Sequence, residues 1–152
     1  MCICPLTEAN LGDGIADVPD ILKHNGRICL GTDSNARISF IEEMRWLEYV
    51  QRLAGERRGV CTDESGNCAQ SLWRMATLHG ADVLGINTGK IEAGYAADLV
   101  TIDLNHLSLA GWSRDTLLDA LVFGSSDEAI AATCVNGKWI ESPASEQHPF
   151  SG

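Results

Sequence analysis

The residues of this chain best suited to chemistry follow a short apolar run. Residues 28–30 (Ile-Cys-Leu) lie within Arg27–Gly31 and predict a short strand that is buried on both faces. Asp33 and Ser34 come shortly after it, and α/β folds place reactive groups at the C-terminal ends of such strands. The carboxylate of Asp33 could bind a divalent metal ion and move a proton, and Ser34 could bind substrate or metal-bound water. In a simpler interpretation, Asp33 only caps the following helix.

A polar segment near the N-terminus could contribute to the same site. Residues 7–14 read Thr-Glu-Ala-Asn-Leu-Gly-Asp-Gly, and this composition predicts a loop with a fixed backbone shape. Within it, Glu8 and Asn10 could form hydrogen bonds with a substrate or orient neighbouring groups. In the simpler interpretation, the loop contributes only a turn.

The spacing of cysteine and histidine does not predict a metal site. The six cysteines are at positions 2, 4, 29, 61, 68 and 134, and the pairs Cys2-x-Cys4 and Cys61-x6-Cys68 lack the C-x-x-C spacing of zinc sites. Several have apolar neighbours, which favours free thiols and a reducing cytoplasm. His79 lies on an apolar helical stripe and is expected to be a hydrogen-bonded core residue.

Hydrophobic periodicity predicts the elements that position these groups. Helices are expected over Pro19–Asn25, Ser39–Leu53, Ala69–Leu84 and Thr116–Phe123. The acidic residues Glu42, Glu43 and Glu48 are expected on a solvated helix face. Strands are expected over Ala97–Asp103, Ile130–Val135 and Lys138–Ile140, and Asn136-Gly137 predicts a hairpin between the last two. The front half therefore reads as βα units and the back third as a small antiparallel sheet.

The composition excludes several classes of protein. The chain has 152 residues, a net charge of −10 and 45% hydrophobic residues, as expected of a soluble globular protein. No apolar run approaches the roughly 18 residues of a membrane helix. The acidic charge argues against a nucleic-acid or anionic-membrane partner. We therefore expect a small-molecule substrate and a homo-oligomer.

Two segments in order resemble the metal-dependent amidohydrolase superfamily. Gly89-Lys-Ile-Glu-Ala-Gly-Tyr-Ala-Ala-Asp-Leu-Val-Thr-Ile-Asp103 is similar to its closing segment, and Cys134-Val-Asn-Gly-Lys-Trp-Ile140 follows as the superfamily pattern requires. The strand end Leu30-Gly-Thr-Asp-Ser34 resembles the eighth barrel strand. Residues 4–14 and 42–53 are similar to the formimidoylglutamate deiminases, a subgroup of iminohydrolases in histidine breakdown.

The resemblance implies an α/β fold. Residues 1–88 would form the last βα units of an incomplete (β/α)8 barrel, 89–141 strands of a small β-sandwich with a connecting helix, and 142–152 a tail. Asp33 would be a ligand of a divalent metal, zinc, and the proton-transfer group. Glu8, Asn10 and Ser34 would contact the substrate. The implied reaction hydrolyses N-formimidoyl-L-glutamate to N-formylglutamate and ammonia.

The chain departs from this superfamily in two ways. A barrel of about 250 residues cannot fit in 152, and the four histidines (24, 79, 106 and 148) include no His-x-His pair. We therefore expect the C-terminal portion of an amidohydrolase. Two alternatives stay open: a guanine-type deaminase, and a catalytically inert fragment that self-associates through apolar surface left by the incomplete barrel.

Overall fold

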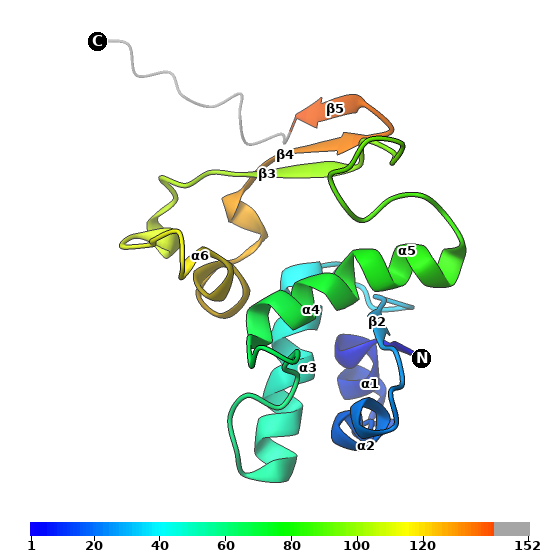
Figure 1. Ribbon diagram of the computed structural model, residues 1–152. Helices are drawn as coiled ribbons and strands as arrows, with labels where there is room; N and C mark the ends of the chain where they lie inside the picture. The colour runs from blue at the N-terminus through cyan, green and yellow to red at the C-terminus, as the bar shows by residue number, and fades with distance from the viewer. Residues whose placement is uncertain (142–152) are drawn as a thin grey trace.

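A computed structural model describes residues 1–141, so the predicted tail, 142–152, lies outside the described residues (Figure 1). The elements follow in the order β1 (Cys2–Ile3), α1 (Pro5–Leu11), α2 (Val18–Lys23), β2 (Cys29–Leu30), α3 (Phe40–Gly55), α4 (Cys68–Ala76), α5 (Leu78–Leu84), β3 (Leu99–Ile102), the 3-10 turn η1 (Leu107–Leu109), α6 (Leu117–Asp119), the π-helical turn η2 (Ala120–Gly124), the 3-10 turn η3 (Asp127–Ala129), β4 (Ile130–Val135) and β5 (Lys138–Glu141). None of the helices among these residues is long and apolar enough to cross a membrane.

The first layer contains two parallel strands covered by helices. β1 pairs with β2, with Cys2 opposite Cys29 and Ile3 opposite Leu30. Ile3 and Leu30 are buried in one core with Met44 of α3 and further apolar residues of α4. Parallel strands joined through helices are the units that build an α/β barrel, and the described part of the chain contains no closed barrel. The fold class expected from the sequence is therefore confirmed.

The back third forms a separate three-stranded antiparallel sheet in the order β3-β4-β5. Figure 1 shows this sheet apart from β1 and β2, beyond helices α4 and α5. Asn136 and Gly137 link β4 to β5, and both have positive φ (48° and 78°), the conformation that a two-residue hairpin turn requires. The predicted hairpin is confirmed.

The loop predicted over residues 7–14 is wrong in its first part. Pro5 begins helix α1, where its missing N–H costs nothing, and the side chain of Glu8 accepts a hydrogen bond of 2.9 Å from the N–H of Cys4. Gly12 ends the helix in the left-handed conformation (φ 76°). Capping at both ends outweighs the turn-forming composition, so Glu8 and Asn10 are helical residues.

The single helix predicted over Ala69–Leu84 is two helices. The chain breaks at Thr77 (φ −125°, ψ −87°), whose hydroxyl donates to the carbonyl of Trp73. Gly89 approaches this break so closely that a Cβ on it would lie 2.9 Å from backbone atoms of Thr77 and Leu78. The contact of Gly89 with Thr77 and Leu78 is a tertiary feature, so hydrophobic periodicity within residues 69–84 cannot predict it.

Candidate active site

The C-terminal ends of β1 and β2 bring two of the predicted residues, Asp33 and Glu8, near Cys4. Burial raises the pKa of the Cys4 thiol, and the negative charges of Asp33, Glu8 and Glu43 raise it further. Cys4 follows β1 directly, and Asp33 lies three residues after the end of β2. Carboxylates from α1, from α3 and from the turn after β2 therefore share one region at the strand ends.

Asp33 is exposed and sits in a tight turn. Its backbone is in the left-handed region (φ 45°), which Asp adopts more readily than most residues. Among the described residues, no hydrogen bond or ion pair occupies its carboxylate. Ser34 is exposed beside it. An exposed carboxylate with free oxygens at a strand end is available to a ligand. The cap of α3 is Ser39 instead, whose hydroxyl oxygen accepts a hydrogen bond from the N–H of Glu42.

Two hydrogen bonds join helix α1 to its surroundings, one to the turn that carries Asp33 and one to α3. The Thr7 hydroxyl donates to the carbonyl of Thr32 at 2.8 Å, immediately before Asp33. One step further into the molecule, the N–H of Leu6 donates to Oε2 of Glu43 at 3.0 Å. Helix α1, the turn that carries Asp33 and the start of α3 are thus held together.

Among the described residues, no side-chain hydrogen bond joins Asn10 to this region. It is exposed near the C-terminal end of α1. Its role in substrate binding stays a prediction, as do those of Glu8 and Ser34.

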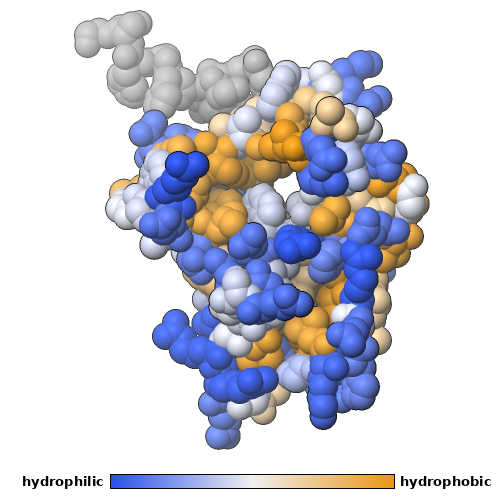
Figure 2. Space-filling model, viewed as in Figure 1, coloured by the Kyte–Doolittle hydropathy of each residue, from blue (hydrophilic) through white to orange (hydrophobic). Residues whose placement is uncertain are grey.

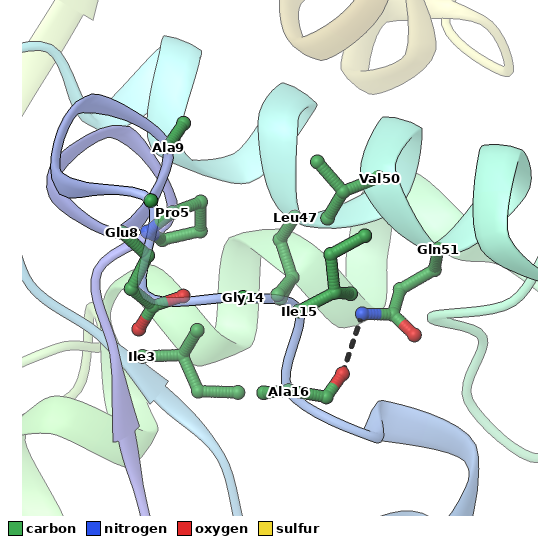
Figure 3. Close-up of a pocket in the computed structure, with 11 residues that line it drawn as sticks. Ile3, Pro5, Glu8, Ala9, Gly14, Ile15, Ala16, Leu47, Val50 and Gln51 are labelled. Atoms are coloured by element: carbon green, nitrogen blue, oxygen red, sulfur yellow. Dashed lines mark hydrogen bonds between the residues drawn. The ribbon is translucent and has the colours of Figure 1, made fainter.

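A cavity of about 270 Å³ lies next to Glu8, on the side of β1 that faces the helices (Figure 3). Ile3, Leu47 and Val50 line it, and its second polar side chain, Gln51, donates to the carbonyl of Ala16 at 2.7 Å. Asp33 is not among its lining residues. The cavity is therefore mainly apolar and separate from the strand-end carboxylate.

Glu43 is the residue at this site that sequence reasoning missed. Its side chain is fully buried, Oε2 accepts from Leu6, and within residues 1–141 Oε1 has no partner. Burial raises its pKa. The prediction that Glu43 and Glu48 lie on a solvated face is wrong. Each glutamate is four residues from an apolar core residue of the same helix, Leu47 for Glu43 and Met44 for Glu48. Residues four apart share one face of a helix, so this spacing could have indicated that both glutamates are buried.

The second buried carboxylate, Glu48, organises a loop. Its oxygens accept from the N–H groups of Gly59, Val60 and Cys61 and from Nε of Arg52 at 2.8–3.2 Å. Burial acts to raise its pKa, but the hydrogen bonds from Arg52 and the backbone outweigh burial, and the pKa is lowered. The charged segment after α3 is anchored to the core through this one side chain.

Asp33 stands alone as a candidate metal ligand. Within residues 1–141, no three His, Cys, Asp or Glu side chains are arranged to hold a metal ion. All six cysteines are free thiols. The Nδ1–H of His79 donates to the carbonyl of Ile28 at 2.8 Å, which confirms the hydrogen bond predicted for this residue.

Comparison with known proteins decides the family. The family model described as "Amidohydrolase family" matches residues 1–140. This chain belongs to the amidohydrolase family. It is 38% identical over 139 residues to formimidoylglutamate deiminase of Pseudomonas aeruginosa, covering 91% of this chain and 31% of that protein. It is 34% identical to 5-methylthioadenosine/S-adenosylhomocysteine deaminase of Thermotoga maritima, covering 90% of this chain and 32% of that protein.

A solved structure supports the fold. The zinc-bound adenosine deaminase of Xanthomonas campestris superposes with a TM-score of 0.78 at 24% identity, covering 91% of this chain and 31% of that one. The chain thus spans about a third of the length of the amidohydrolases that it matches. The resemblance expected from the sequence is confirmed, and the substrate is left open by relatives with different substrates.

Proposed function

We propose that this chain forms the C-terminal part of the active site of a hydrolytic deaminase, in which Asp33 is the reactive group. The observation that carries the proposal is the position of Asp33: an exposed carboxylate at the C-terminal end of β2, in a turn fixed to the end of β1 by Thr7. Family membership supports hydrolysis of a non-peptide C–N bond. We further propose that the substrate is N-formimidoyl-L-glutamate, because formimidoylglutamate deiminase of Pseudomonas aeruginosa is 38% identical over most of the chain.

The side chains of residues 1–141 can supply one ligand of a zinc ion but not a complete zinc site. A carboxylate oxygen is a normal zinc ligand, and Asp33 is free to act as one, whereas the remaining ligands must come from polypeptide other than residues 1–141. When bound, zinc supplies a hydroxide nucleophile by lowering the pKa of water. A carboxylate oxygen of Asp33 would accept a proton from the attacking water and return it to the departing ammonia.

The surrounding residues hold Asp33 and the substrate. Thr7 fixes the turn before Asp33, and Glu43 fixes the helix that carries Thr7. Ser34, next to Asp33, is proposed to donate its hydroxyl to the substrate. Glu8 and Asn10 are proposed to hydrogen-bond the polar groups of the substrate. The products would be N-formylglutamate and ammonia, a step of histidine breakdown that we place in the cytoplasm, in keeping with six free thiols.

A chimera tests the proposal. Residues 1–140 replace the matching segment of the Pseudomonas aeruginosa deiminase, and ammonia release is measured with formimidoylglutamate, S-adenosylhomocysteine and guanine. We expect activity on formimidoylglutamate, a loss of at least about 1,000-fold in kcat for Asp33→Asn, and an unchanged rate for Asp115→Asn, an exposed acid further along the chain. An Asp33→Asn chimera with full activity would remove Asp33 from the mechanism, and activity on a purine alone would replace the substrate.

A second candidate is a purine deaminase of the guanine type that the sequence left open. The 34% identity to 5-methylthioadenosine/S-adenosylhomocysteine deaminase of Thermotoga maritima supports a purine derivative as this second substrate. The same chimera assay distinguishes the two.

The non-catalytic alternative is supported by exposed apolar side chains. Ile91, Leu107 and Leu53 are each at least 80% exposed, and such surface drives association between copies. Sedimentation of the 152-residue chain, with zinc analysis of each species, tests it. A metal-free oligomer without activity supports this alternative for the isolated chain. A monomer contradicts self-association.

A further inference from the structure

A second cavity, of about 840 Å³, lies at the N-terminal end of β2, whereas Asp33 follows the C-terminal end of that strand. His79 lines this cavity and is held there by its hydrogen bond to the carbonyl of Ile28, the residue before β2. Asp33 is not among the lining residues. Small-molecule sites in proteins usually measure about 300–1,000 Å³. The cavity is therefore large enough for a ligand and separate from the proposed deaminase site.

Helix α4 presents a buried hydroxyl to this cavity. Ser71 lines the cavity and is only 6% exposed, and within residues 1–141 no hydrogen bond engages its hydroxyl. Arg74 lies three residues further along α4, on the same face of the helix, and also lines the cavity. Buried polar side chains normally have a hydrogen-bond partner. A polar group bound in the cavity would supply the partner that Ser71 lacks.

Opposite charges line the cavity near each other. Asp63 enters it from the loop after α3, and its Oδ1 accepts hydrogen bonds of 3.0 Å from the N–H groups of Ser65 and Asn67. Hydrogen bonds from these two residues lower the pKa of Asp63, and the positive charge of Arg74 lowers it further. Arg74 is thus close enough to act on Asp63, yet among the described residues no ion pair joins them. Glu64 adds a second, exposed carboxylate.

These charges suit a ligand that carries both signs. A carboxylate matches the planar fork of Arg74, which can donate two parallel hydrogen bonds to it. An ammonium group matches the carboxylates of Asp63 and Glu64. A simple anion would be repelled by the two carboxylates, and a simple cation would leave Arg74 without a partner. A dipolar molecule satisfies both ends of the cavity.

We propose that this cavity binds a free α-amino acid, whose carboxylate accepts from Arg74 and from the hydroxyl of Ser71 and whose ammonium donates to Asp63. The Nε2 atom of His79 is a further acceptor for the ammonium, because the Nδ1–H of the neutral ring donates to Ile28. The site is independent of the proposed deaminase reaction, which takes place at the other end of β2.

Amide side chains point to the probe for a test. Asn25 and Gln70 line the rest of the cavity, so an amino acid with an uncharged polar side chain fits it. Isothermal titration calorimetry of the 152-residue chain with L-glutamine should give one site per chain with a Kd below about 1 mM. L-Glutamine methyl ester and N-acetyl-L-glutamine should each bind at least about 10-fold more weakly, because each lacks one of the two charges.

Arg74→Gln tests the carboxylate contact. We expect it to weaken L-glutamine binding at least about 10-fold and to leave the affinity for the methyl ester unchanged, because the ester has no carboxylate for Arg74 to hold. Ser71→Ala should weaken L-glutamine binding about 5-fold through the loss of one hydrogen bond. The matched control is Arg114→Gln, an exposed arginine that does not line the cavity, which should leave binding unchanged.

Near-UV circular dichroism of each variant verifies that the fold is kept. The proposal is overturned if wild type does not bind L-glutamine, or if the acid and its methyl ester bind equally. It is also overturned if Arg74→Gln weakens binding of the ester as much as binding of the acid, since the arginine would then act on the fold and not on the carboxylate.

Discussion

The hydroxyl of Thr7 donates a hydrogen bond of 2.8 Å to the carbonyl of Thr32, and so joins the two strand ends at which the candidate site lies. Thr7 is 3% exposed, and its partner immediately precedes Asp33. The turn that carries the proposed reactive group is therefore fixed by a residue of the preceding βα unit. Motif comparison alone assigns no role to this threonine.

Replacement of Thr7 by Val should lower the free energy of unfolding by about 1–2 kcal/mol, because the carbonyl of Thr32 loses its buried donor while the side-chain volume is kept. Thr7→Ser keeps the hydroxyl and should cost less. Urea denaturation of the 152-residue chain measures both. A Val variant as stable as the Ser variant would show that the hydrogen bond has no net effect.

Replacement of Glu48 by Gln should be among the most damaging single changes, at about 3–5 kcal/mol, because it leaves Arg52 and three backbone N–H groups with a weaker acceptor. Glu42→Gln, at a partly exposed site on the same helix, should cost less than about 1 kcal/mol.

The difference in unfolding free energy between Glu48→Gln and wild type should depend on pH. Since the pKa of Glu48 is lowered by folding, its contribution is present above the ordinary glutamate pKa and is lost as the pH falls through the lowered value. Denaturation at pH 7 and at pH 3 checks this.

Glu43 should show the opposite pH dependence. Burial raises its pKa, so its contribution to stability is greatest below the ordinary glutamate pKa and is lost as the pH rises through the raised value. The stability of Glu43→Gln relative to wild type should therefore increase with pH across that interval. Unfolding free energies measured from pH 4 to pH 8 give the result, and a difference independent of pH would contradict it.

Replacement of Gly89 by Ala should destabilise the chain by about 3 kcal/mol, because the methyl group would meet backbone atoms of Thr77 and Leu78 at 2.9 Å and the position has φ 85°. Gly85 is the matched control. It also has positive φ (68°), but a Cβ there would have nothing within 4 Å, so Gly85→Ala should cost only about 1 kcal/mol. Thermal denaturation of the two variants separates steric contact from backbone conformation.

Local features of this chain could be predicted from its sequence because neighbouring residues cause them. The β4–β5 hairpin follows from Asn136-Gly137, whose backbone adopts positive φ at little cost. Helix α3 follows from its apolar spacing and from Ser39 as its cap. The position of Asp33 after a buried strand was also evident, since the apolar run ends three residues before it.

Only the tertiary structure decided where the carboxylates of α3 lie. Glu43 and Glu48 are hydrophilic by type, and burial becomes favourable only when distant backbone N–H groups, from Leu6 and from Gly59–Cys61, converge on them. The break at Thr77 likewise depends on the return of Gly89, twelve residues away. The local sequence pattern predicts which secondary structure a segment prefers. The energy of a buried charge or of a close backbone contact depends instead on distant residues that come near only when the chain folds.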